Sequence, residues 1–160
     1  MLKYVDTLVS FQEVPDEISL CINISNCPCH CEGCHSSYLA EDIGKELTKE
    51  ELTELINSNK GISCVSFMGG DSDPWQIAHL AVFIKEIYPN LKVSWYSGKD
   101  KIHSYIAAMY HKFDYIKIGP YIPKLGGLDK ETTNQIMYKI KDNEFIDITY
   151  RFKHDSKSSV

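Results

Sequence analysis

Four runs of apolar, β-branched and aromatic residues recur along the chain, and each has the length of a β-strand. They cover residues 18–24, 62–68, 91–96 and 115–118. A weaker run covers residues 146–152, where apolar residues alternate with polar ones. Short apolar runs of this composition are typical of buried strands, and alternation is typical of a half-buried one. The pattern therefore predicts four strands and a less certain fifth.

Helical patterns lie between these runs, and two of them have clear start signals. Thr48-Lys-Glu-Glu51 and Asp73-Pro-Trp-Gln76 each combine a capping side chain with Glu or Gln three residues later. The first amphipathic run ends before Gly61, and the second stops at Pro89. Two further helices are expected after Asp100 and Asp129.

Strands that alternate with helices predict an α/β fold, because right-handed βαβ units build a mostly parallel sheet. A complete eightfold βα barrel takes about 250 residues, whereas this chain has 160. We therefore expect a partial, open βα barrel. A single domain is expected over residues 1–152, with a disordered tail over residues 153–160, where Asp-Ser-Lys-Ser-Ser lacks apolar residues.

The charge pattern narrows the classes of partner. The formal net charge is -5, and Lys and Arg are scattered along the chain, so no basic stripe is available to follow a nucleic acid backbone. No apolar run is long enough to cross a membrane, and the first residues lack a secretion signal. These features predict a cytoplasmic protein that binds neither nucleic acid nor membranes.

A crowded cysteine loop follows the first predicted strand. Cys27, Cys31 and Cys34 have the spacing C-x3-C-x2-C, and Cys29 lies between them. A 4Fe-4S cluster that takes all its ligands from protein needs four cysteines, so three thiolates leave one iron open. An open coordination position allows a metal site to bind and activate a ligand. We predict that Cys27, Cys31 and Cys34 hold such a cluster; the spacing leaves the role of Cys29 open.

A structural zinc site is the alternative for this loop. Cys31 and Cys34 would form one ligand pair, completed by Cys29, His30 or His35. Structural zinc sites usually combine two separated ligand pairs, and no second pair occurs downstream. The spacing therefore favours the cluster.

Glycine and polar residues follow the next predicted strands. Gly69, Gly70 and Asp71 end the second, and Ser97 ends the third. The carboxyl ends of parallel strands form the edge where α/β proteins bind ligands. Glycines there let a ligand approach the backbone closely. The four residues are predicted to bind a cofactor.

The cysteine spacing at the end of the first strand resembles the signature of the radical S-adenosylmethionine superfamily. The resemblance implies that the open iron chelates S-adenosylmethionine, whose reductive cleavage gives methionine and a 5'-deoxyadenosyl radical. It also implies that Gly33 lies near the adenine. By the same resemblance, Gly69-Gly70-Asp71 matches an element that holds the amino group of the methionine.

Most of the chain resembles the activating proteins of class III anaerobic ribonucleoside-triphosphate reductases. The likeness includes Cys-Glu-Gly-Cys-His, the Gly-Gly-Asp element, Trp-Tyr-Ser-Gly, Ile-Gly-Pro-Tyr and Thr133-Asn-Gln135 in the last predicted helix region. It implies that the chain generates a glycyl radical on the reductase subunit, and we expect reduced flavodoxin or ferredoxin as the electron donor. Ile118 and Thr132-Thr133 depart from the acid and the Ser-Ser pair that relatives often carry.

The size of the domain agrees with a protein substrate. A partial barrel with few additional residues needs a docked macromolecule to shield a radical from water. Three alternatives remain: an activator of another glycyl-radical enzyme such as pyruvate formate-lyase, a radical enzyme that acts on a free metabolite, and a zinc-stabilised interaction module without catalysis.

Overall fold

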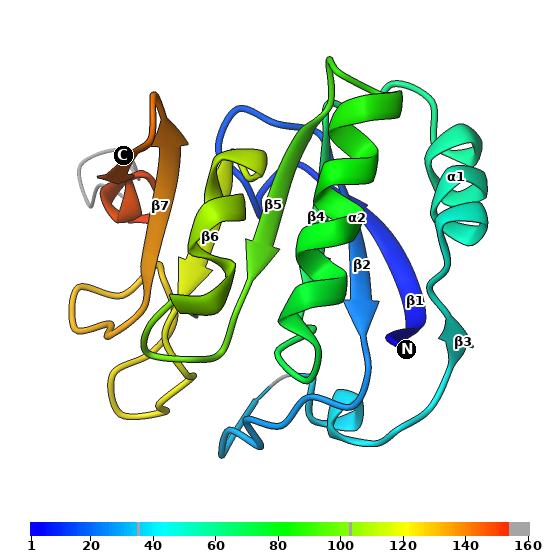
Figure 1. Ribbon diagram of the computed structural model, residues 1–160. Helices are drawn as coiled ribbons and strands as arrows, with labels where there is room; N and C mark the ends of the chain where they lie inside the picture. The colour runs from blue at the N-terminus through cyan, green and yellow to red at the C-terminus, as the bar shows by residue number, and fades with distance from the viewer. Residues whose placement is uncertain (35, 103, 154–160) are drawn as a thin grey trace.

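The computed structural model describes residues 1–34, 36–102 and 104–153, without the side chains of residues 105–108. Within these residues the chain forms one eight-stranded sheet with the order β3-β1-β2-β4-β5-β6-β7-β8 (Figure 1). The strands are β1 (Lys3–Ser10), β2 (Ser19–Ile24), β3 (Lys45–Glu46), β4 (Cys64–Met68), β5 (Lys92–Tyr96), β6 (Tyr115–Ile118), β7 (Ile136–Lys141) and β8 (Glu144–Asp147). The α-helices are α1 (Lys49–Ser58) and α2 (Pro74–Ile87), and the 3-10 helices are η1 (Ser37–Ala40), η2 (Ser104–Lys112) and η3 (Thr149–Phe152).

The centre of the sheet is parallel. Strands β2, β4, β5 and β6 pair in parallel, whereas β1 and β3 on one side and β7 and β8 on the other pair antiparallel. The α/β class and the open sheet are confirmed. The four central strands lie within the four predicted runs, because strands buried on both faces carry continuous apolar runs that are easy to recognise.

The antiparallel flanks were not predicted. In the region of the fifth candidate, residues 146–152, the structure has the end of β8 followed by η3, and the prediction of one strand there is wrong. Strand β7 instead forms a hairpin with β8 around Asp142 and Asn143, whose φ angles are 53° and 62°. Asp and Asn tolerate the positive φ angles that a two-residue hairpin turn requires.

The helix predictions are confirmed for α1 and α2. The Thr48 hydroxyl accepts the Glu51 N–H at 3.0 Å, and the Asp73 carboxylate accepts the Gln76 N–H at 3.2 Å. After Asp100 the chain forms the 3-10 helix η2. The helix expected after Asp129 is wrong, because residues 130–132 form a bend and a turn, and an irregular segment then leads into β7. Thr133-Asn-Gln135 therefore precedes a strand.

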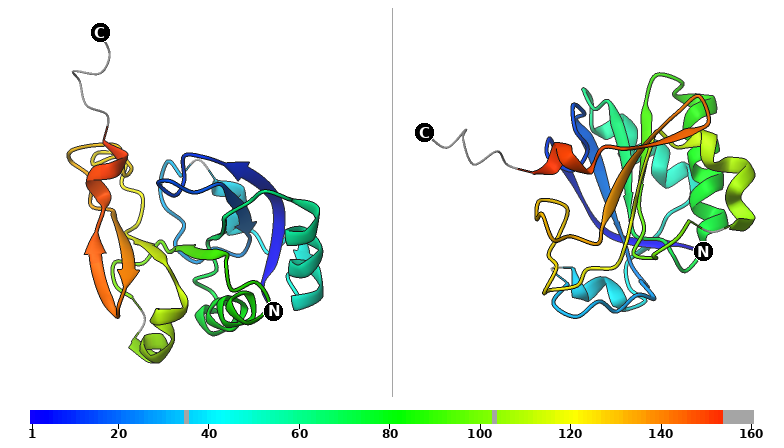
Figure 2. Two further views of the ribbon diagram at one scale, coloured as in Figure 1. Left: turned by 90° about the horizontal axis from the view of Figure 1, so that it is seen from above. Right: turned by 90° about the vertical axis from the view of Figure 1, so that its left-hand side faces the viewer.

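The two faces of the sheet differ in chemistry. Helices α2 and η2 cover one face, while η3 and the loops after β1 and β6 lie on the other (Figure 2). The helix-covered face buries large apolar side chains such as Phe67, Trp95 and Ile116. Successive side chains of a strand point to opposite faces, so the residues that alternate with these apolar ones lie on the other face. They include Cys64, Tyr96 and Lys117. This second face leads to the site described below.

The predictions of a disordered tail and of no membrane-spanning segment can be compared only with the described residues. Of the tail expected from residue 153 onward, all but Lys153 lies outside the described residues. Among the described helices, none is long and apolar enough to cross a membrane.

Candidate functional site

A cavity of about 270 Å³ lies at the carboxyl ends of the parallel strands. Its lining includes residues that follow β2, β4 and β5 and residues of β6. Of the predicted site residues, it brings together Cys27, Cys31, Cys34, Gly69, Asp71 and Ser97. Cys29 lines the same cavity, whereas Gly33 and Gly70 are not part of its lining.

Backbone hydrogen bonds anchor the start of the cysteine loop. The N–H groups of Asn26 and Cys27 donate to the carbonyls of Glu41 and Leu39 at 2.9 and 2.8 Å. Asn26 has a φ of 58°, which turns the chain sharply as it leaves β2. The four thiols of the loop are partly exposed, so reactants have access to them. His35, the other histidine of the zinc alternative besides His30, lies outside the described residues.

Cys27 and Cys29 differ in their protonation behaviour. A hydrogen bond from the Cys29 thiol lowers the pKa of Cys27 to about 6, although partial burial opposes this effect. The same contact, together with burial, raises the pKa of Cys29. The thiolate is the form that ligates metals, so the hydrogen bond between these two thiols favours one thiolate beside one protonated thiol.

The donor set fits an iron-sulfur cluster. Cys27, Cys31 and Cys34 supply thiol groups to one cavity whose exposed lining is mostly apolar. Within the part of the chain that the structure describes, no three Cys, His, Asp or Glu side chains are grouped so as to hold a single metal ion. A cubane cluster binds each thiolate through a different iron, so its ligands need not converge on one point.

Asp71 is the acidic residue among the described residues that line the cavity, and hydrogen bonds hold its carboxylate. Only 6% of the residue is exposed. Its carboxylate accepts the Ser97 hydroxyl at 2.5 Å and the Gly98 N–H at 2.8 Å, and Cys29 Sγ lies 3.7 Å from Oδ2. Ser97, predicted to donate to the cofactor, donates to Asp71. These contacts fix the carboxylate at the cavity wall.

The two glycines before Asp71 bring the ends of the strands close to their neighbours. Gly69 and Gly70 have φ angles of 107° and 100°, and the Gly69 carbonyl accepts the Trp95 indole N–H at 2.8 Å. A Cβ atom on Gly70 would lie 2.5 Å from Ile77 Cδ1, in the first turns of α2. Gly70 therefore allows α2 to pack against the end of β4.

Gly33 joins the cysteine loop to the segment after β6. A Cβ atom there would lie 3.1 Å from Pro123 Cγ and 3.6 Å from the Tyr121 ring. Its φ of 69° also favours glycine. The structure thus gives Gly33 and Gly70 clear packing roles outside the cavity lining.

Sequence reasoning missed Lys117 in β6. This lysine is 8% exposed and lines the cavity, where its Nζ donates to the Ser97 and Gly119 carbonyls at 3.1 and 2.8 Å. A lysine inside an apolar four-residue strand was the available signal, because lysines are rarely buried without a partner. Ile118, the departure noted in the sequence, instead packs into the core on the helix-covered side.

One of three comparisons with known proteins gives a match. Residues 18–116 match the family model of the 4Fe-4S single cluster domain, a stretch that runs from the start of β2 into β6 and includes the cysteine loop, Asp71 and Ser97. The comparison with curated proteins and the comparison with solved structures give no match. The family match covers more than half of the chain, and it supports a 4Fe-4S cluster as the cofactor. This chain belongs to the 4Fe-4S single cluster domain family, a type of domain typical of the iron-sulfur enzymes that act as radical S-adenosylmethionine activases.

Proposed function

We propose that this chain is the activating enzyme of an anaerobic ribonucleoside-triphosphate reductase, and that it generates a glycyl radical on the reductase with S-adenosylmethionine. The observation that carries the proposal is the single cavity in which Cys27, Cys31 and Cys34 meet Asp71 and Ser97. A redox cofactor and the residue that orients its cosubstrate must both reach the same bound cosubstrate. Residues that line one cavity meet this requirement.

The cysteines and Asp71 have separate tasks. A 4Fe-4S cluster bound by Cys27, Cys31 and Cys34 supplies the electron that cleaves S-adenosylmethionine. The carboxylate of Asp71 accepts a hydrogen bond from the amino group of the methionine moiety. Charge-assisted hydrogen bonds of this kind are strong and directional. Ser97 and the Gly98 N–H hold the carboxylate in place. Its orientation is therefore set before the cosubstrate binds.

The apolar part of the lining protects the reaction. Ile24, Leu39 and Met68 line the cavity beside the thiols, and such side chains exclude water from a reactive species. The thiols themselves remain partly exposed. The reductase subunit closes this side by docking its glycine loop, which would lose a Cα hydrogen atom to the 5'-deoxyadenosyl radical and so leave 5'-deoxyadenosine and the glycyl radical. Reduced flavodoxin or ferredoxin delivers the electron.

Two elements of the sequence resemblance pack together beside the cavity. Asn134 Nδ2 donates to the Pro120 carbonyl at 3.0 Å, and Gln135 Nε2 donates to the Gly119 carbonyl at 3.4 Å. Gln135 also lines the cavity. The Gly-Pro and Thr-Asn-Gln elements thus form one structural unit beside the cavity.

Anaerobic reconstitution with iron and sulfide tests the cofactor. We expect a brown protein with broad sulfur-to-iron charge-transfer absorption, which releases 5'-deoxyadenosine from S-adenosylmethionine after chemical reduction. A colourless protein that retains zinc would instead establish the interaction module. A protein that holds the cluster but releases no 5'-deoxyadenosine would contradict the radical chemistry.

Mixing experiments test the partner. The reconstituted chain, S-adenosylmethionine and a reductant are incubated with the glycyl-radical subunit of the reductase or, in parallel, with pyruvate formate-lyase. We expect a glycyl signal in electron paramagnetic resonance with the reductase alone. A signal with pyruvate formate-lyase and none with the reductase would assign the chain to the other class of activator.

A further inference from the structure

Lys117 is a charged residue of the cavity that has no role in the proposed function. It lies in β6, between Ile116 and Ile118, and its side chain is on the sheet face opposite the helix-covered core. Burial of an ammonium group is costly unless surrounding groups compensate for it. A lysine kept at 8% exposure in a cavity wall therefore calls for a physical explanation.

The contacts of Lys117 hold its ammonium group without cancelling the charge. Its two hydrogen bonds go to the carbonyls of Ser97 and Gly119, which are neutral groups at the ends of β5 and β6. The ammonium also lies 5.9 Å from the centroid of the Tyr96 ring, whose face attracts cations. The charge thus stays available to act on the cavity.

Negative groups of the cavity are the charges that act on Lys117. Burial lowers the pKa of this lysine, whereas Asp71 first, and then Cys31, Cys29 and Cys34, raise it. Two of these cysteines are proposed cluster ligands. Because Lys117 lines the same cavity as Cys31 and Cys34, a buried positive charge lies in the wall that faces the position of the cluster.

The backbone fixes the position of this charge. The Ser97 N–H donates to the Lys117 carbonyl at 2.9 Å, and the Gly119 N–H donates to the Lys99 carbonyl at 2.7 Å. Lys117 is therefore held at its backbone carbonyl by Ser97, and at its ammonium group by the carbonyls of Ser97 and Gly119. Its distance from the thiols cannot vary as that of a solvent-exposed lysine does.

We propose that Lys117 is a positioning residue that raises the reduction potential of the cluster through its fixed positive charge. Reduction adds one negative charge to the cluster, and a nearby cation in a medium of low dielectric constant stabilises the reduced form. Charge and hydrogen bonding around a cluster are established determinants of its potential. This inference rests on the cluster of the proposed function.

The test compares Lys117→Gln, Lys117→Met and Lys117→Arg in the full-length, reconstituted protein. Glutamine keeps a donor and loses the charge, methionine loses both, and arginine keeps the charge. Lys124→Met is the matched control, because Lys124 is an exposed lysine on the loop after β6. The midpoint potential is measured by redox titration, with the reduced cluster detected by electron paramagnetic resonance.

We expect both neutral variants to shift the equilibrium about tenfold toward the oxidised cluster, which is about 59 mV for one electron. The arginine variant and the Lys124→Met control should keep the wild-type potential. Unchanged potentials in the neutral variants would overturn the inference. It would also be overturned if the arginine variant lost potential or cluster content to the same extent as the neutral ones, because hydrogen bonding or packing would then be the cause.

The wild-type sample separates this inference from the proposed function. A wild-type protein that binds no cluster after reconstitution would contradict the proposed function itself. A wild-type cluster whose potential is insensitive to Lys117 would contradict the role of the lysine alone. Circular dichroism of the cluster-free variants checks that each one folds.

Discussion

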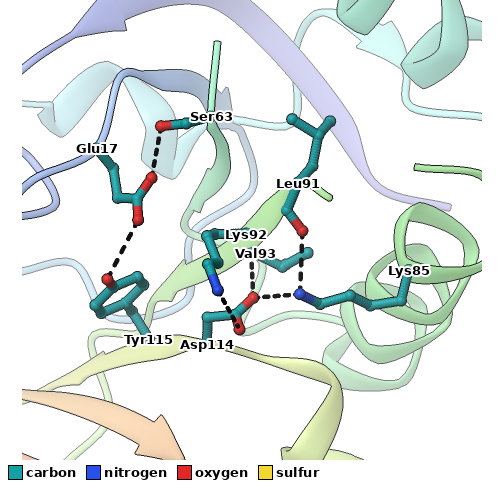
Figure 3. A network of polar contacts seen from close by, with 8 residues as sticks. All are labelled: Glu17, Ser63, Lys85, Leu91, Lys92, Val93, Asp114 and Tyr115. Atoms are coloured by element: carbon teal, nitrogen blue, oxygen red, sulfur yellow. Dashed lines mark hydrogen bonds and ion pairs between the residues drawn. The ribbon is translucent and has the colours of Figure 1, made fainter. Parts of the chain in front are cut away.

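The two ends of the four central strands use the same kinds of charged residue in different ways. At the amino ends, the polar groups bind one another (Figure 3). Asp114, just before β6, accepts the Val93 N–H at 2.8 Å and forms ion pairs with Lys85 and Lys92. Nearby, Glu17 accepts the Ser63 hydroxyl at 2.5 Å. The charges at this end are used to hold strands, loops and α2 together.

The carboxyl ends hold their acid and their lysine by neutral groups. Asp71 accepts from a hydroxyl and a backbone N–H, and Lys117 donates to two carbonyls. A hydrogen bond to a neutral group fixes a side chain without neutralising it. The ion pairs of Asp114 hold the fold together at the amino ends, whereas Asp71 and Lys117 at the carboxyl ends are held in the wall of the cavity. Four predictions sharpen this difference.

The largest effect is expected from Cys31→Ala. Loss of one of three ligands should lower the iron content and reduce 5'-deoxyadenosine release by more than about a hundredfold, beyond what loss of a supporting group costs. Cys64→Ala is the control, because this buried thiol lies in β4 and outside the cavity lining. Iron analysis and chromatography provide the measurements. Wild-type iron content in Cys31→Ala would show that Cys31 is not a ligand.

Gly70→Ala should destabilise the carboxyl ends. Its positive φ and the contact with Ile77 together should cost about 3 kcal/mol in free energy of unfolding. Gly61→Ala is the matched control, because Gly61 has a φ of 89° and nothing within 4 Å of an added Cβ. It should cost about 1 kcal/mol. Equal losses in urea unfolding would mean that the contact with Ile77 relaxes freely.

Asp114→Asn should destabilise the amino ends without affecting the cluster. The substitution leaves Lys85 without its carboxylate, and because both side chains are partly exposed the expected loss is about 2 kcal/mol. Urea unfolding of the cluster-free protein measures it. Iron content after reconstitution should equal that of the wild type, and a loss of iron would show that the two ends are coupled.

The smallest effect concerns Glu13, on the loop after β1, which lies on the sheet face opposite α2 and η2. Burial raises the pKa of Glu13 above its ordinary value of 4.5. The folded state therefore binds a proton more tightly than the unfolded state, so this group's contribution to stability falls as pH rises from below 4.5 through the raised pKa.

Glu13→Gln removes this pH dependence. The variant should be more stable than the wild type at pH 7, by no more than about 1 kcal/mol because the site is partly solvated. The advantage should disappear near pH 4, where the wild-type carboxyl is protonated in both states. Thermal unfolding at the two pH values measures the difference. A variant with the same relative stability at both would contradict the assignment to burial.

Local signals in the sequence were sufficient for the centre of the fold and for part of the site. The strands β2, β4, β5 and β6 are buried on both faces, so each is a continuous apolar run. Thr48 and Asp73 cap their helices through contacts only three residues away. The cysteine spacing likewise lies on one short loop. In each case the physical cause acts over a few residues, and the pattern is visible in the chain.

Only the tertiary structure decided the rest. The half-exposed β1 and the β7–β8 hairpin form because neighbouring strands supply hydrogen-bonding edges, and such pairing joins segments far apart in the chain. The partners of Gly70 and Lys117 come from other elements of the fold: a helix side chain for one, and carbonyls after two different strands for the other. The sequence by itself determined the cysteine spacing and the Gly-Gly-Asp element that make their residues candidates for the chemistry. Long-range packing decided which of them share a cavity, since burial and electrostatic fields depend on distance in space.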